Sequence, residues 1–296
     1  MKPAIFQISR RSFLKACAAT TAASGLPLWF LEEEEARGSL AAEPGSANDR
    51  PGVALIGCGG RGTADGKSAI RFGDMLAVCD VDQGHAEQAA KTFAKDGHEP
   101  QVYSDFRKVL ERKDIHIIIN GTPDHWHTLV NLGAARAGKD IYSEKPLTLT
   151  INEGQRLVKA VREKKVILQT GTQQRSDKNF RLACELVRNR RIGELKEIVV
   201  WLPAGLQGGP FASSPAPPGL NWDFYLGQAP RVDYVKERCH FSFRYWFDYA
   251  GGTTTDWGAH HNDIAFWATG RKGPDTIEGK VLVQPVPGRL QRVQRV

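Results

Sequence analysis

The stretch of sequence that decides the fold reads Val53-Ala54-Leu55-Ile56-Gly57-Cys58-Gly59-Gly60-Arg61-Gly62. An apolar run followed at once by G-x-G-x-x-G is typical of a buried strand that turns directly into a helix. Gly57 permits the tight turn, Gly59 lets the backbone approach a pyrophosphate, and Gly62 lets the helix pack closely on the strand. Free N–H groups at the helix N-terminus favour an anion. The stretch therefore predicts a dinucleotide-binding domain.

A second apolar strand supports this prediction. It runs from Met75 to Cys79 and ends at Asp80, about the separation expected for an acid that hydrogen-bonds a ribose 2′-hydroxyl. A carboxylate at this place repels a 2′-phosphate, so Asp80 favours NAD over NADP as the cofactor. The alternative interpretation is a glycine turn followed by a surface carboxylate.

Short apolar runs alternate with amphipathic segments as far as residue 172. We expect further strands at Ile115–Asn120, Asp140–Ser143 and Val166–Thr170, with helices between them such as His127–Ala137 and Ile151–Lys164. This alternation predicts a parallel sheet covered by helices on both faces. Residues 51–172 are therefore expected to form a doubly wound α/β (Rossmann) domain.

The pattern changes after residue 172, where a second, α+β domain is expected over residues 173–296. The predicted elements are a helix at Asp177–Arg190, a strand at Glu194–Leu202, a long loop at Pro203–Gly219 and a last helix from about Thr255. After Lys280 only one strand-like piece follows, at Val281–Val283. A sheet of this kind needs several strands to cover its apolar faces, so we expect the second domain to be incomplete.

The N-terminus is typical of an export signal. Residues 9–15 read Ser-Arg-Arg-Ser-Phe-Leu-Lys and match the twin-arginine pattern, and a modest apolar run to Leu31 follows. This run is too short and too mixed for a clear membrane span, although an amphipathic helix or an uncleaved anchor is an alternative. We predict a signal segment over residues 1–42, recognition by the twin-arginine export machinery, and a periplasmic or otherwise exported protein.

The composition excludes other classes. The 296 residues are 41% hydrophobic and 25% charged, which excludes gross disorder. The formal net charge of +7 is carried by scattered residues, with no basic tract interleaved with aromatics, so no nucleic-acid partner is expected. Apart from Cys17 in the leader, four cysteines remain and have no C-x-x-C spacing. A disulfide framework is therefore not expected.

A candidate catalytic lysine follows the strand at Asp140–Ser143, in the sequence Glu144-Lys145-Pro146. The carboxyl ends of parallel strands are where ligands bind in open α/β sheets. An ammonium group beside a substrate hydroxyl donates hydrogen bonds and stabilises a developing alkoxide. The alternative is a surface lysine paired with Glu144.

A candidate base and acid lie further along the chain. In Gly251-Gly252-Thr253-Thr254-Thr255-Asp256-Trp257-Gly258-Ala259-His260, the acid and the histidine are four residues apart. On a helix Asp256 and His260 would therefore project from one face. Histidine titrates near neutral pH and accepts a hydroxyl proton as hydride leaves the carbon. The alternative is a helix-capping acid and a structural histidine.

These three motifs, in this order and spacing, resemble those of the Gfo/Idh/MocA family of NAD(P)-dependent sugar and polyol oxidoreductases, over about residues 51–275. The exported twin-arginine branch is most similar, with its Asn-Trp-Asp-x-x-x-Gly segment at residues 221–227. The resemblance implies that Lys145 is the catalytic lysine, Asp256 the conserved acid and His260 the catalytic histidine. It also implies a largely antiparallel second domain that often mediates oligomers, and it allows a homo-oligomer here.

The family's threonine-proline turn beside the cofactor matches Thr122-Pro123, which Asp124-His125-Trp126-His127 follows. The residues expected to bind the cofactor are therefore Gly57, Gly59, Gly60, Arg61, Gly62, Asp80, Thr122, Pro123, His125, His127, Glu144 and Lys145. The pairs His125-x-His127, Cys239-His240 and His260-His261 are far apart and form no compact metal-ligand set, so no metal is expected.

The reaction we expect is reversible oxidation of a secondary hydroxyl on a carbohydrate-like small molecule: a sugar, sugar acid or cyclitol. His260 would move the hydroxyl proton, Lys145 would stabilise the alkoxide, and Asp256 would orient the substrate or His260. Trp222, Tyr245 and Trp246 would either stack on a sugar ring or pack in the core. One alternative is an NAD-dependent glycosidase that works by transient oxidation and elimination. A further alternative is a truncated, non-catalytic nucleotide-binding fragment.

Overall fold

The chain divides into two compact units, and the second begins at Pro51. The computed structural model describes residues 50–203, 205 and 208–278. The predicted leader and the predicted strand at Val281–Val283 lie outside these residues. In the part of the chain that the structure describes, none of the helices has the length and apolar character needed to cross a membrane.

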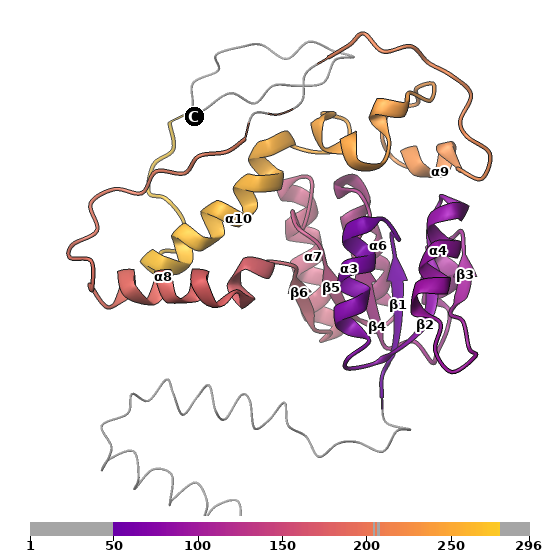
Figure 1. The fold of residues 1–296 in the computed structure, drawn as a ribbon, viewed down its shortest axis with the longest axis horizontal. Coiled ribbons are helices and arrows are strands. Elements are labelled where there is room, and N and C mark those ends of the chain that lie inside the picture. Colours follow the sequence, from indigo (N-terminus) through magenta and orange to yellow (C-terminus); the bar gives the residue numbers. More distant parts are fainter. Residues whose placement is uncertain (1–49, 204, 206–207, 279–296) are drawn as a thin grey trace, which may run out of the picture. The chain divides into compact units, whose positions relative to one another are not determined.

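A six-stranded sheet in the order β3-β2-β1-β4-β5-β6 forms the first part of the second unit (Figure 1). Its strands are β1 (Gly52–Ile56), β2 (Asp74–Cys79), β3 (Gln101–Tyr103), β4 (Ile117–Asn120), β5 (Asp140–Ser143) and β6 (Leu168–Thr170). All neighbouring strands are parallel, which confirms the predicted fold class. The strand order reverses between β1 and β4, so a crevice opens at their carboxyl ends.

Helices cover both faces of this sheet. They are α3 (Gly60–Ala69), α4 (Gln83–Phe93), α5 (Phe106–Leu110), α6 (Asp124–Arg136) and α7 (Ile151–Lys164). The residues of β1 alternate between two buried clusters: Val53 and Leu55 belong to one, and Ala54 and Ile56 to the other. Successive side chains of a strand point to opposite faces, so an all-apolar strand of this kind is buried on both sides.

Local sequence sets where these helices begin. Thr150 and Glu153 form a capping box before α7, each side chain accepting a hydrogen bond from the other residue's backbone N–H. The carboxylate of Asp82 caps α4 by accepting hydrogen bonds from two N–H groups of its first turn. In contrast, α3 begins after Gly59 without any side-chain cap. Its first N–H groups are thus left for a ligand at the glycine turn.

Beyond β6 the described residues form helices and loops. The elements are η2 (Gln173–Ser176), α8 (Lys178–Arg188), α9 (Trp222–Leu226), η3 (Lys236–Arg238), η4 (His240–Tyr245) and α10 (Gly252–Thr269). Figure 1 shows α10 packed along α8. The prediction of a strand at Glu194–Leu202 is wrong, because no strand of the described residues lies beside it to pair with its backbone. Val199 and Trp201 in this segment are exposed.

Candidate active site

The glycine turn between β1 and α3 is too crowded on its inner side for any other residue. Gly57 has a φ of +87°, and a Cβ on it would lie 2.5 Å from the carbonyl carbon of Gly121. A Cβ on Gly62 would lie 2.0 Å from the carbonyl oxygen of Gly57. On the outer side no atom of the part of the chain that the structure describes lies within 4 Å of a Cβ built on Gly59 or Gly60. The turn therefore packs tightly against β4 and leaves open space over the start of α3.

Asp80 fastens this turn to the end of β2. One oxygen, Oδ2, accepts a 2.7 Å hydrogen bond from the N–H of Cys58, and Oδ1 accepts a 2.9 Å bond from the N–H of Asp82. Burial raises the pKa of Asp80, and these two N–H groups oppose that shift. The carboxylate therefore sits in a fixed orientation, and its remaining lone pairs are available to a ligand.

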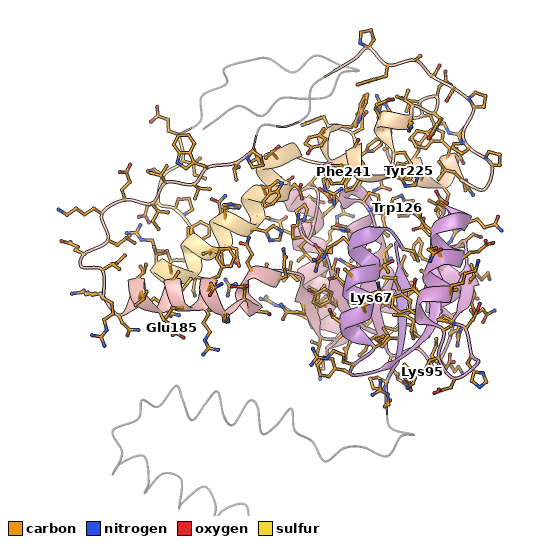
Figure 2. The ribbon with its side chains drawn as sticks, in the orientation of Figure 1. Lys67, Lys95, Trp126, Glu185, Tyr225 and Phe241 are labelled. Atoms are coloured by element: carbon orange, nitrogen blue, oxygen red, sulfur yellow. The ribbon has the colours of Figure 1, made fainter. Side chains whose placement is uncertain are left out.

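A cavity of about 470 Å³ lies in front of the turn. The predicted cofactor residues that line it are Gly57, Gly59, Gly60, Arg61, Asp80, Thr122 and Pro123. Trp126, Tyr225 and Phe241 also line this cavity and lie together above the sheet in Figure 2. An open glycine backbone at a helix N-terminus, a fixed carboxylate and aromatic walls are the features that a dinucleotide requires, so these residues fit NAD.

A second cavity, of about 280 Å³, contains all three predicted catalytic residues, Lys145, Asp256 and His260. The two cavities adjoin, since Arg61, Thr122, Phe243 and Arg244 line both. Lys145 follows β5 and the other two residues lie on α10, so the fold brings together groups that are far apart in sequence.

Lys145 and Asp256 form an ion pair between Nζ and Oδ1, and their side chains are only 12% and 15% exposed. The ammonium group also donates a 3.2 Å hydrogen bond to the backbone carbonyl of Asp256. On the other side, the Nε of Arg244 lies 3.5 Å from Asp256 Oδ2. Partial burial strengthens the Coulombic attraction between the two charges, and it makes loss of either partner costly because the other charge would be left unpaired. Asp256 therefore holds the ammonium group of Lys145 in place over the cavity.

His260 lies one helical turn after Asp256 and is buried. Its Nε2 is 3.3 Å from the Nε2 of Gln173, while its buried Nδ1 has no hydrogen-bond partner among the described residues. Burial lowers the pKa of His260, and the nearby Lys145 ammonium lowers it further. The imidazole is therefore neutral near pH 7 and able to accept a proton.

Glu144 and Arg61 brace this site from the side of the sheet. Arg61 Nε donates to Glu144 Oε1 at 3.0 Å and to Asp65 Oδ2 at 3.2 Å. The other oxygen of Glu144 accepts a 3.1 Å hydrogen bond from the backbone N–H of Lys145. Burial and the proximity of Glu144 raise the pKa of Asp65 to about 7. The side chain of Glu144 thus anchors the backbone of Lys145. The sequence predicts a cofactor contact for Glu144 and does not predict this anchoring contact.

Two predicted cofactor residues line neither cavity. Gly62 lies beneath the turn, and His125 packs between Tyr225 and Tyr249, with its Nε2 3.0 Å from the carbonyl of Tyr225. His127 does line the catalytic cavity, and its ring nitrogens lie 2.6 Å from the carbonyl oxygen of Pro146 and 2.8 Å from that of Thr122. It therefore bridges two turns of the site.

The structure also adds residues to the catalytic cavity that the sequence motifs do not single out: Asp124, Gln173 and Arg244. Asp124 begins α6 and is buried, and burial raises its pKa to about 8 against the opposing charges of Arg244 and Lys145. The position of Asp124 directly after the Thr122-Pro123 turn is the feature of the sequence that indicates it.

Trp222 and Trp246 pack in the aromatic core, and the indole N–H of each donates a hydrogen bond to a backbone carbonyl. Neither tryptophan lines the catalytic cavity.

Comparisons with known proteins agree with this arrangement. A family model described as an oxidoreductase family with an NAD-binding Rossmann fold matches residues 52–172. The model of the same family's C-terminal alpha/beta domain matches residues 205–284. A model of the twin-arginine translocation signal sequence matches residues 7–27.

Among individual proteins, an alpha-N-acetylgalactosaminidase of Shewanella oneidensis is 31% identical over 49% of this chain and 35% of its own length. A myo-inositol 2-dehydrogenase of Thermotoga maritima is 23% identical over 80% of this chain and 60% of its own length. The solved scyllo-inositol dehydrogenase of Lactobacillus casei, with bound NAD(H) and scyllo-inositol, superposes with a TM-score of 0.51 at 21% identity, over 75% of this chain and 57% of that one. The chain thus spans between about a third and three fifths of the length of these relatives.

Proposed function

Because the chain belongs to the Gfo/Idh/MocA oxidoreductase family and begins with a twin-arginine signal sequence, we propose that it transfers a hydride between NAD and a secondary hydroxyl of a sugar, sugar acid or cyclitol in the periplasm. The observation that carries the proposal is the convergence of Lys145, Asp256 and His260 on one cavity that adjoins the cavity at the glycine turn. A dinucleotide at the turn and a hydroxyl at the lysine would then be neighbours.

The contacts of the three residues support a proposed role for each. The neutral imidazole of His260 accepts the proton of the substrate hydroxyl. The ammonium group of Lys145 donates a hydrogen bond to the same oxygen and stabilises its developing negative charge. Asp256 holds that ammonium group in position through the ion pair and the backbone bond. When bound, NAD⁺ supplies the hydride acceptor.

NAD is proposed over NADP because of Asp80. Its fixed carboxylate stands at the end of β2, where a second negative charge on the ribose would be repelled. The twin-arginine route carries folded proteins, so the nucleotide would be exported already bound.

A second candidate is NAD-dependent glycoside cleavage, in which one hydroxyl of the sugar is transiently oxidised to a ketone and the aglycone is eliminated. Water then adds to the resulting double bond, and the ketone is reduced again. The buried carboxyl of Asp124 favours it, since a pKa of about 8 keeps an acid protonated at neutral pH in the catalytic cavity. Such an acid can protonate a departing glycosidic oxygen. The similarity to an alpha-N-acetylgalactosaminidase supports the same candidate.

One experiment separates the candidates. Purified protein is incubated with NAD⁺ and a panel of cyclitols, sugars, sugar acids and aryl glycosides, and both NADH absorbance and aglycone release are followed. NADH accumulation with a cyclitol or sugar is the result expected for the dehydrogenase. Aglycone release without net NADH would show the glycosidase instead. Bound NAD with neither reaction would contradict both candidates and leave a nucleotide-binding protein.

A further inference from the structure

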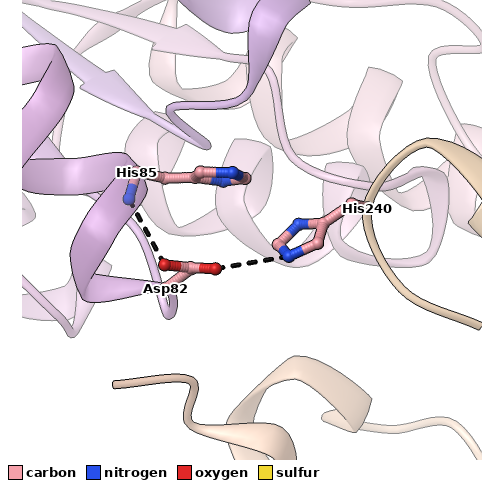
Figure 3. A group of neighbouring side chains, drawn as sticks. All are labelled: Asp82, His85 and His240. Carbon is pink, nitrogen blue, oxygen red and sulfur yellow. Dashed lines mark hydrogen bonds and ion pairs between the residues drawn. The ribbon is translucent and has the colours of Figure 1, made fainter. Parts of the chain in front are cut away.

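Three side chains gather at the rim of the dinucleotide cavity: Asp82, His85 and His240 (Figure 3). Asp82 follows β2, His85 lies in the first turn of α4, and His240 begins η4. One donor atom from each residue lies within 4.8 Å of those of the other two. None of the three belongs to the catalytic cavity. No metal site is expected from the sequence, because there His240 is paired only with its neighbour Cys239 and lies far from Asp82 and His85.

The carboxylate of Asp82 is held in a fixed orientation. Its Oδ1 accepts hydrogen bonds from the N–H groups of Gly84 at 2.9 Å and His85 at 3.3 Å. The other oxygen, Oδ2, points to the ring of His240 and lies 3.3 Å from its Nε2 (Figure 3). Hydrogen bonds that orient one oxygen of a carboxylate while the other faces outward are typical of the second shell around a metal ligand.

The imidazole rings of His85 and His240 lie close to each other. Their centroids are 4.5 Å apart at an interplanar angle of 52°. A second carboxylate, that of Asp80, has its Oδ2 3.9 Å from His85 Nδ1, so a second negative charge lies beside the cluster. His240 has a φ of +50°, in the left-handed region that favours glycine. Such strain persists where the surroundings fix a residue, which is common at ligand-binding positions.

We propose that Asp82, His85 and His240 bind a divalent transition-metal ion, with Zn²⁺ as the expected occupant. Two imidazoles and one carboxylate, with a further position left open, are a ligand set that Zn²⁺ takes in proteins. Mg²⁺ and Ca²⁺ prefer oxygen ligands and do not suit two imidazoles. Ligands from α4 and η4 would let the ion join the sheet domain to the segment that covers its cavity.

Metal binding is tested directly on untagged full-length protein by equilibrium dialysis against Zn²⁺, followed by metal analysis. One equivalent of Zn²⁺ is expected. His240→Ala, His85→Ala and Asp82→Asn should each weaken binding by at least about tenfold. Asp82→Asn retains an oxygen that caps α4, so it removes the charged ligand with little effect on the helix. His98→Ala, at an exposed histidine in a turn, is the matched control and should bind like the parent.

Two results would overturn the proposal. One is a parent protein that binds no stoichiometric Zn²⁺; the other is binding that His240→Ala and His85→Ala leave unchanged. Either would mean that Asp82 and His240 form a hydrogen bond alone. Should a histidine variant fail to fold, the unmodified protein loaded with Co²⁺ decides. Intense visible absorption bands of a four-coordinate ion are expected, and the weak spectrum of the hydrated ion would contradict the site.

Discussion

Lys145 owes its position to one contact from its neighbour in sequence and one from a distant part of the chain. Glu144 fixes its backbone N–H, and Asp256 on α10 pairs with its ammonium group. A lysine at a strand tip would otherwise extend into solvent, since its long side chain is strongly hydrated. The sequence could identify Lys145 from its motif, but not the Arg61–Glu144 contact that braces it, because that contact depends on how α3 packs over β1 and β4.

At this residue we predict that Lys145→Met strongly slows catalysis while leaving NAD binding nearly unchanged. Loss of the donor that stabilises the alkoxide should lower kcat by about 10²- to 10³-fold. Steady-state rates and NAD titration by intrinsic fluorescence measure the two effects. Lys159→Met, at a lysine on the exposed side of α7, is the control and should retain the parent rate. A Lys145 variant within a few fold of the parent would remove Lys145 from the mechanism.

Asp80 carries the choice of cofactor. Asp80→Asn keeps a side chain that can bond to the turn but removes the charge that repels a 2′-phosphate. We expect NAD affinity to fall by about tenfold and the preference for NAD over NADP to shrink. Titration of both nucleotides measures the ratio, with Asp96→Asn at an exposed turn as control. An unchanged ratio of the two affinities would mean that another group discriminates between the cofactors.

At the scale of elements, α6 joins the sheet domain to the aromatic segment through His125. Burial lowers the pKa of His125 to about 4, so the folded protein holds this histidine neutral. The unfolded chain binds a proton near the ordinary pKa of about 6.5, whereas the folded chain does not. The contribution of His125 to stability is therefore fully present above pH 6.5 and is lost as the pH falls toward 4.

The lowered pKa of His125 leads to a prediction about the stability of the protein at acid pH. Between pH 7 and pH 4.5 the parent should lose about 2 kcal/mol more unfolding free energy than His125→Asn, which cannot take up the proton. Urea unfolding at the two pH values measures the difference. His98→Asn, at an exposed histidine, should follow the parent. If His125→Asn shows the same loss as the parent, burial of His125 is not the source of the acid sensitivity.

The elements also show where sequence reasoning fails. The expected helix Ile151–Lys164 agrees with α7, because residues next to its start determine where it begins: Thr150 and Glu153 form a capping box. The three-residue strand β3 was missed because it is too short to show a pattern. The wrong strand at Glu194–Leu202 has strand-like residues, but a strand needs a neighbour, and neighbours are set by tertiary packing rather than by local sequence.

At the scale of the whole described unit, two segments far apart in sequence enclose the same cavity. The glycine turn forms one wall, and η4 forms part of the opposite one. The motifs predicted the first wall because a strand, a turn and a helix follow one another directly. They could not predict the second, since nothing local places His240–Tyr245 over the sheet.

Because the glycine turn and η4 line the same cavity, we predict that both segments respond to NAD. Added NAD should slow amide hydrogen exchange both at the glycine turn and in η4, because each loses solvent contact when the cavity is filled. Hydrogen exchange followed by mass spectrometry measures both segments in one experiment. The helix α8, which lines neither cavity, serves as the internal control. Slower amide exchange at the glycine turn but not in η4 would show that η4 does not form part of the nucleotide site.

The most direct test of the central claim follows the hydride itself. The protein is incubated with NAD⁺ and cyclitols or sugars that carry deuterium on the carbon of each secondary hydroxyl, and the nicotinamide is analysed by mass spectrometry. The account predicts deuterated NADH from at least one member of the panel, and its loss in Lys145→Met. NAD that stays bound without gaining deuterium from any member, or a Lys145→Met protein that gains it as fast as the parent, would contradict hydride transfer at this site.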